Sequence, residues 1–142
     1  MNTLKVKLLN SAAKLPTRAY KADAGLDLYA VEKETIPPKT YKTIHFGIAM
    51  EIPVGYVGKV HIRSGLASRG YSIMQGVGVI DAGYRGEIMA TILNCNQAYA
   101  VIEQGERVCQ LLIEPIELPD VIQCDELSKS DRDTGGFGST GK

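Results

Sequence analysis

Residues 78–94 read Gly-Val-Ile-Asp-Ala-Gly-Tyr-Arg-Gly-Glu-Ile-Met-Ala-Thr-Ile-Leu-Asn, two apolar runs on either side of a charged, glycine-rich turn. In the second run, residues 88–93, both alternating sets of side chains are largely apolar, so both faces of the strand that it predicts are apolar. A small barrel covers only one face of such a strand. We therefore expect the second face to lie in a subunit interface.

Comparable short runs recur along the whole chain, at residues 6–9, 26–31, 41–52, 56–62 and 108–113. They are rich in β-branched and aromatic residues and are bounded by turn residues, which is typical of β-strands. The prolines all fall at run ends, where a missing N–H does not interrupt a ladder. Only one or two helical turns are expected, beginning at Ser64. The sequence therefore predicts an all-β fold, closed as a jelly-roll-like barrel.

Length and charge limit the classes of function. With 142 residues, the chain has the size of one domain that can bury its own core. Its 16 basic and 16 acidic residues give no net charge, whereas surfaces that bind duplex DNA or anionic membranes need clustered Lys and Arg. We expect neither a nucleic-acid partner nor a membrane partner, and any nucleotide ligand should be small.

The cysteines and the N-terminal residues bear on the cellular compartment. Cys95, Cys109 and Cys124 are odd in number and widely spaced, which predicts neither a disulfide framework nor a zinc site. Residues 1–7 lack the apolar core of a signal peptide, and no segment approaches the ~20 apolar residues of a membrane span. These features predict a cytoplasmic protein.

The composition changes at residue 128. Residues 128–142 hold four glycines and one large apolar side chain, Phe137. Such a segment buries too little apolar surface to offset the conformational entropy that it loses on ordering. We expect residues 1–127 to form the β-barrel domain and residues 128–142 to be a flexible flap that orders over a ligand. A disordered tail is the alternative.

Two carboxylates stand out as candidates for a site. Asp81 is the stronger, because an apolar run delivers it to a turn beside Tyr84 and Arg85. An ordinary β-hairpin with a turn Asp is the alternative. Asp27 lies inside an apolar strand, where an unpaired carboxylate is costly. For Asp27, a structural hydrogen bond and a functional role are about equally favoured.

Other polar residues favour an anion as the ligand. Arg63 and Ser64 combine a cation with a hydroxyl that is expected to cap the short helix and leave N–H groups for an anion, with a plain helix cap as the alternative. Gln110 lies in a buried run and needs a neighbouring strand or a phosphate as its partner. His45 and His61 lack a carboxylate or cysteine at ligand spacing, so structural roles are expected. Anion-binding groups outnumber nucleophiles, which favours attack by water.

In order along the chain, residues 24–30, 63–67, 78–87, 105–111 and 132–141 resemble the five signatures of the trimeric dUTPases. Five motifs in order, ending in Gly-Phe-Gly-Ser-Thr-Gly, are far more specific than one. The resemblance implies an all-β homotrimer with shared active sites that uses Mg²⁺ to hydrolyse dUTP to dUMP and pyrophosphate. Such an activity limits uracil incorporation into DNA and supplies dUMP for thymidylate synthesis.

The resemblance also implies a role for each site residue. Asp81 would position and help deprotonate the attacking water, while the other catalytic and phosphate-binding residues would be Arg63, Ser64, Gly65 and Gln110. Asp27 would touch metal-bound water rather than the metal. Tyr84 would pack under the deoxyribose, and uracil would be read by the backbone around Gly78, Val79 and Ile80. The tail would clamp the γ-phosphate and stack on the base through Arg132, Phe137, Gly138, Ser139 and Thr140.

The chain departs from the usual family pattern at three positions. Gln75 stands where many relatives have Asn, so backbone groups must read the base. Cys109 stands where Ala is commoner, and we expect it to act as a small packing residue. Asp133 replaces a usual Gly and adds negative charge close to the expected clamp.

Two other functions are compatible with parts of this pattern. The related trimeric dCTP deaminases share the fold but need an acid/base group beside the pyrimidine ring, whereas here the pattern Gly-Val-Ile-Asp-x-x-Tyr favours phosphate hydrolysis. A nucleotide-gated interaction module is the second alternative. Retention of Asp81, Ser64 and the whole tail argues against a catalytically inactive sensor.

Overall fold

The computed structural model describes residues 3–137 and 139, and it is almost entirely β. The strands are β1 (Lys5–Leu8), β2 (Leu26–Tyr29), β3 (Glu34–Ile36), β4 (Tyr41–His45), β5 (Ile48–Glu51), β6 (Tyr56–Ile62), β7 (Tyr71–Ile73), β8 (Gly78–Ile80), β9 (Met89–Asn94), β10 (Ala100–Ile102) and β11 (Arg107–Pro115). One short helix, α1 (Ser64–Ala67), follows β6. No helix in the described residues is long and apolar enough to cross a membrane.

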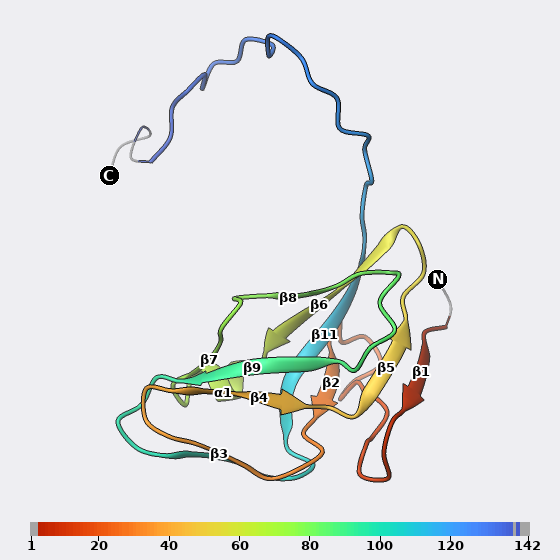
Figure 1. Cartoon of the computed structure of the whole chain (residues 1–142), viewed down its shortest axis with the longest axis vertical. Helices are drawn as coiled ribbons and strands as arrows, with labels where there is room; N and C mark the ends of the chain where they lie inside the picture. The colour runs from red at the N-terminus through yellow and green to blue at the C-terminus, as the bar shows by residue number, and fades with distance from the viewer. Residues whose placement is uncertain (1–2, 138, 140–142) are drawn as a thin grey trace.

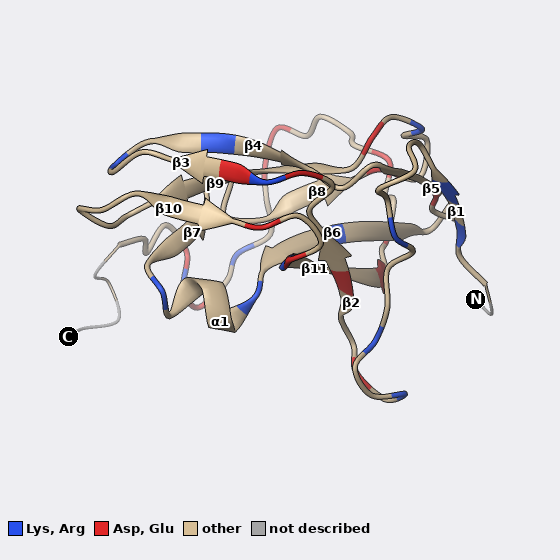
Figure 2. Ribbon diagram, turned by 90° about the horizontal axis from the view of Figure 1, so that it is seen from below, with Lys and Arg blue, Asp and Glu red and all other residues tan. Residues whose placement is uncertain are grey.

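The strands form antiparallel sheets that pack face to face. One sheet has the order β2-β11-β6-β8 and another has the order β4-β9-β7, while β1 pairs with β5 and β10 pairs with β3. Figure 2 shows two layers, with β3, β4, β9 and β10 in one and β2, β6 and β11 in the other. This arrangement confirms the predicted all-β, jelly-roll fold. The core between the layers is aliphatic except for Phe46, and its fully buried residues include Leu28, Ile36, Ile44, Phe46, Ile48, Ile92, Ile102 and Leu111.

The predicted strands are present, with two kinds of difference. The long run at residues 41–52 is divided into β4 and β5 at Gly47, whose φ of 62° lies in the left-handed region. A Cβ on Gly47 would lie 2.7 Å from Val31 Cγ1, so this corner needs glycine for its space as well as its backbone. The apolar run before Asp81 forms the strand β8, whereas three further three-residue strands, β3, β7 and β10, were not predicted.

The turn after β8 is not the end of a hairpin. β8 pairs with β6, whereas the next strand, β9, pairs with β4 and β7 in the other sheet. The alternative of an ordinary β-hairpin across residues 78–94 is therefore wrong. The chain crosses from one layer to the other between Asp81 and Ile88, as strands do at the corners of jelly rolls. A turn that joins two layers is held at both ends by different sheets.

In the single chain only one face of β9 is buried, whereas the sequence predicts a strand covered on both faces. Ala90, Ile92 and Asn94 are buried, while Met89 is exposed and Thr91 and Leu93 are half-buried in the single chain. The inner face therefore packs in the core, and the outer face keeps partly accessible apolar surface.

The chain leaves the barrel after β11. In Figure 1 the segment after β11 extends away from the body in a long arc. Between residues 116 and 137 it has no strand or helix. Its apolar side chains are exposed, and they include Leu118, Val121, Ile122 and Leu127.

Candidate functional site

Four of the predicted phosphate-binding and metal-linked residues meet around one cavity. This cavity has a volume of about 330 Å³ and is lined by Ala19, Asp23, Ala24, Gly25, Asp27, Arg63, Ser64 and Gln110. Its walls come from the loop before β2, from β2 itself, from the junction of β6 with α1, and from β11. Segments far apart in the sequence thus converge on one polar cavity.

Asp27 is held between two arginines. Its carboxylate is almost buried; Oδ1 lies 2.9 Å from Arg63 Nε and Oδ2 lies 3.1 Å from Arg107 Nη1. Two charge-assisted contacts offset the cost of burying a carboxylate. Asp27 therefore has a structural role in this chain, but its partners are two arginine side chains rather than backbone groups. The same pairing places Asp27 on the wall of the cavity.

A β-bulge in β11 creates this arrangement. Arg107 pairs with Tyr29, but Cys109 pairs with Leu28, so the register shifts by one residue between them. In a regular strand, Arg107 and Gln110 would point to opposite faces, because they are three positions apart. The extra residue lets Arg107 bond to Asp27 while Gln110 lies directly opposite Asp27 on the same wall. Sequence reasoning missed Arg107, since a bulge leaves no local signal.

Gln110 reaches the cavity through a gap left by a glycine. A Cβ on Gly25 would lie 2.5 Å from Gln110 Oε1 and 3.2 Å from its Cβ. Gly25 is therefore the residue that lets the amide lie against β2. Across the described part of the chain, the Gln110 side-chain amide makes no hydrogen bond, which leaves its donors and acceptor for a ligand.

The predicted capping role of Ser64 is wrong. The helix cap is Arg63, with extended backbone angles of −72° and 143°, and Ser64 is the first helical residue. The reason is the β6 ladder, which keeps Arg63 extended through its N–H bond to the Val108 carbonyl, 3.2 Å away. Ser64 is exposed at the cavity and has no side-chain capping bond, whereas Gly65 is exposed in the neighbouring cavity lined by Arg107.

The second group of predicted residues lines a different cavity. Its volume is about 210 Å³, and its walls are Val79, Ile80, Asp81, Tyr84, Glu87 and Met89. Gly78, in β8, packs closely on β6, since a Cβ there would lie 3.2 Å from Val60 Cβ. Arg85 turns away from this cavity and donates to the carbonyls of Ala82 and Tyr84. The sequence analysis did not single out Glu87 and Met89.

The two cavities lie at opposite ends of β6. In the β6–β8 ladder Gly58 pairs with Ile80, which places Asp81 beside Val57, while Ser64 follows the far end of the strand. Seven residues of extended chain separate these positions, or about 23 Å at the usual rise per residue. Gln110 pairs with His61, four positions from Val57, or about 13 Å along the strand. A single chain therefore does not bring Asp81 into contact with either Ser64 or Gln110.

The described tail residues lie at neither cavity. Arg132 Nε donates to the Gly135 carbonyl at 2.9 Å, within the tail itself, and Phe137 is fully exposed. Ser139 donates its N–H to Gly136. Gly138 and Thr140, which the sequence analysis assigned to the clamp, lie outside the described residues. In this chain the described tail residues contact each other rather than either site.

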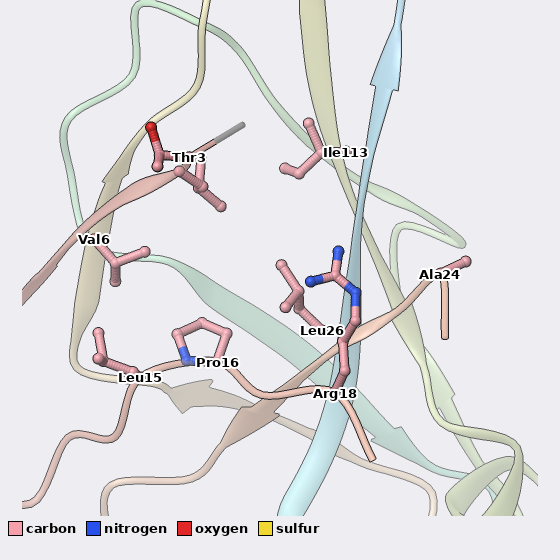
Figure 3. Close-up of a pocket in the computed structure, with 9 residues that line it drawn as sticks. Thr3, Val6, Leu15, Pro16, Arg18, Ala24, Leu26 and Ile113 are labelled. Carbon is pink, nitrogen blue, oxygen red and sulfur yellow. The ribbon is translucent and has the colours of Figure 1, made fainter. Parts of the chain in front are cut away.

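A larger cavity, at the loop before β2, is not the candidate site. It measures about 630 Å³, and Figure 3 shows its lining of apolar side chains, among them Val6, Leu15, Leu26 and Ile113, with Arg18 beside them. Arg18 is the one ionisable group among its lining residues. Such a surface suits apolar side chains better than a triphosphate.

Cys109 and His45 have structural surroundings. Burial raises the pKa of the Cys109 thiol to about 12, so it stays neutral and unreactive, in agreement with the expected packing role. His45 Nδ1 lies 3.0 Å from Glu87 Oε2. The sequence analysis found no carboxylate for His45, because Glu87 comes from the neighbouring strand region and not from nearby sequence.

Comparison with known proteins identifies the family. The dUTPase family profile matches residues 11–141. The deoxyuridine 5'-triphosphate nucleotidohydrolase of Mycobacterium marinum is 44% identical, with 99% of this chain and 96% of the relative covered. The enzyme of that name from Clostridium tetani is 42% identical, with 99% and 97% covered.

Solved structures give the same result. A mutant dUTPase of Staphylococcus bacteriophage 80alpha with dUpNHpp superposes with a TM-score of 0.94 at 34% identity, with 100% of both chains covered. A mutant dUTPase of phage phi11, described with a structural Mg(II) ion, gives a TM-score of 0.82 at 32% identity, with 88% and 98% covered. The profile spans nearly the whole chain, and the two relatives match over nearly their full lengths. The chain therefore belongs to the dUTPase family.

Proposed function

We propose that the chain hydrolyses dUTP to dUMP and pyrophosphate with Mg²⁺, at sites assembled between the subunits of a homotrimer. The observation that carries the proposal is the separation of the two half-sites along β6. Arg63, Ser64 and Gln110 supply cation, hydroxyl and amide groups for phosphate at one end of β6, while Asp81 and Tyr84 supply a carboxylate and a ring at the other end. In a shared site, one subunit supplies the first set of residues and its neighbour supplies the second, so both sets can contact one substrate.

The chemistry follows from these groups. Asp81 accepts a hydrogen bond from the water that attacks the α-phosphorus and takes its proton. Arg63, Ser64 and Gln110 bind the phosphate oxygens as negative charge moves onto the leaving pyrophosphate. Because Asp27 already engages Arg63 and Arg107, Arg63 must exchange part of its contact with Asp27 for contact with phosphate. Arg107 then remains as the partner of Asp27.

The residues fit a metal that is held mainly by the substrate. Among residues 3–137 and 139, no group of three or more His, Cys, Asp or Glu side chains is placed to hold an ion. Mg²⁺ prefers oxygen ligands and keeps several waters. Asp27, at the cavity wall and occupied by two arginines, suits contact with a metal-bound water better than direct ligation. The bound ion would neutralise the triphosphate oxygens.

Two features of the single chain support the trimer. The outer face of β9 keeps partly accessible apolar residues, Met89 and Leu93. The segment after β11 also exposes several apolar side chains, and the cavity in Figure 3 offers apolar surface of the kind that could cover them. Burying such surface between copies is favourable. The flap, residues 128–142, would then close a site formed by other subunits.

Product identification tests the function. The protein is incubated with each dNTP and Mg²⁺, and products are separated by anion exchange. Formation of dUMP and pyrophosphate from dUTP, with the other dNTPs unchanged, is expected. Release of ammonia from dCTP without pyrophosphate would instead identify a dCTP deaminase. Tight binding of dUTP without any product would favour the nucleotide-gated interaction module.

A further inference from the structure

The ring of Tyr84 rests directly on the backbone of Gly86. A Cβ on Gly86 would lie 2.5 Å from Tyr84 Cζ and 3.0 Å from Cε2, and closer still to the hydroxyl. The ring position is therefore available only while residue 86 has no side chain. The hydroxyl donates a hydrogen bond to the Glu87 carbonyl oxygen, 3.0 Å away, which fixes the outer end of the ring.

Glu87 is itself fixed to the corner between β4 and β5. Its carboxylate accepts a hydrogen bond from the Gly47 N–H through Oε1 at 2.9 Å, and Oε2 lies 3.0 Å from His45 Nδ1. The adjacent Ile88 N–H donates to the Ile48 carbonyl at 2.8 Å. The residue whose carbonyl holds Tyr84, and its neighbour Ile88, are thus attached to the corner between β4 and β5 by three contacts. Tyr84 lines its cavity as part of a rigid wall.

We propose that Gly86 and Glu87 set the discrimination against ribonucleotides by holding the Tyr84 ring in this position. Gly86 is then a specificity-determining residue and Glu87 a positioning residue, although neither contacts the sugar. The inference rests on the proposed hydrolysis of dUTP and on Tyr84 facing the deoxyribose. A ring that can move outward leaves room for a 2′-hydroxyl, whereas a ring clamped at both its face and its hydroxyl does not.

The glycine offers a clean test, because it is not needed for its backbone angles. Neither Gly86 nor Gly83 has a φ in the left-handed region. In Gly86→Ala the new methyl group meets a side chain that can swing away, so the turn is expected to fold with the ring displaced. In Gly83→Ala, a matched control from the same turn, the methyl group meets nothing within 4 Å.

The measurement is the ratio of kcat/KM for dUTP to kcat/KM for UTP. Gly86→Ala is expected to lower this ratio by about tenfold or more. A pocket that differs by one small group discriminates between substrates by an amount of this order. Gly83→Ala is expected to leave the ratio unchanged. Tyr84→Phe, which removes only the hydroxyl bond to Glu87, is expected to lower the ratio by a few-fold and serves as the test if Gly86→Ala does not fold.

A double-mutant cycle distinguishes an effect of Gly86 that acts through the Tyr84 ring from an effect that does not. If Gly86 acts through the ring, Gly86→Ala adds nothing to the effect of Tyr84→Ala on the ratio. A ratio that falls in Tyr84→Ala but is unchanged in Gly86→Ala and Tyr84→Phe would overturn this inference and leave the role of Tyr84 intact. An unchanged ratio in Tyr84→Ala would overturn the role of Tyr84 itself.

Discussion

Arg107 Nη1 lies 3.1 Å from Oδ2 of Asp27, on the side of the carboxylate that Arg63 does not occupy. Arg107 lines a neighbouring cavity of about 500 Å³ rather than the one that holds Ser64 and Gln110. Its guanidinium therefore acts on the site through Asp27. With Arg107 in place, Asp27 keeps a counter-ion when Arg63 turns toward a phosphate.

Replacing Arg107 with Met should leave Arg63 as the remaining cation paired with Asp27, so that Arg63 cannot turn toward a phosphate without leaving the carboxylate unpaired. We expect kcat/KM for dUTP to fall by about tenfold or more and the free energy of unfolding to fall by about 1–2 kcal/mol, a value reduced because the side chain is half exposed. Arg107→Lys keeps the charge and should recover part of the activity. Steady-state kinetics and urea unfolding measure both effects. Full activity in Arg107→Met would show that Asp27 needs no second cation.

Because of Cys109, the free energy of unfolding should fall as the pH is raised into the alkaline range. Its folded pKa is about 12, above the ordinary thiol value of about 8.5. Below about pH 8.5 both states hold the proton, and the stabilisation is fully present. As the pH rises from there toward 12, only the unfolded state loses the proton, so stability falls by roughly 1 kcal/mol per pH unit.

Cys109→Ala removes this contribution and keeps the other titrating groups. Urea unfolding of both proteins at pH 8 and pH 10, at one protein concentration, gives the comparison. The free energy of unfolding should fall more steeply with pH in the parent protein than in the variant. Parallel pH dependences would mean that the thiol is accessible to water.

Deleting residues 132–142 should impair catalysis but not folding. The described residues of this segment contribute no buried apolar side chain, so the barrel loses no core. The segment carries a cation, hydroxyls and a ring that would exclude water from the triphosphate. We expect kcat/KM to fall at least about tenfold, with sedimentation and melting unchanged. Full activity in the truncated protein would show that Phe137 and the rest of this segment have no role in catalysis.

Local patterns in the sequence were sufficient for the long strands and for the turn at Asp81. Residues 56–62 form a strand as predicted because the run is rich in aromatic and β-branched residues, Tyr56, Val57, Val60 and Ile62, between two breaks. The short strands β3 and β10 span three residues each, which is too few to show a period of two. Tyr84 and Asp81 lie three residues apart, so their shared cavity was visible in the sequence.

Contacts between distant segments were not visible. Arg107 and Asp27 are 80 residues apart, and their contact depends on a bulge that shifts the register of β11. His45 and Glu87 are 42 residues apart and meet only where the chain crosses between the layers. The capping role expected for Ser64 failed for the same reason, because the β6 ladder holds Arg63 extended.

The shared site makes a quantitative prediction about mixed trimers. Ser64→Ala removes a phosphate donor and Asp81→Asn removes the proton acceptor, and each variant alone should lose at least about 100-fold in kcat. In a trimer with cyclic symmetry, any mixture of the two variants contains one site with an intact Ser64 from one subunit and an intact Asp81 from its neighbour. Random assembly at equal amounts makes about three quarters of the trimers mixed, each with one working site in three.

Co-refolding the two inactive variants and assaying dUTP hydrolysis is the most direct test of the shared site. The expected result is recovery of about one quarter of the parent activity, with none when the variants are mixed without dissociation. Activity no higher than the average of the two variants, in a sample shown by mass spectrometry to contain mixed trimers, would contradict a site divided between Ser64 of one subunit and Asp81 of another.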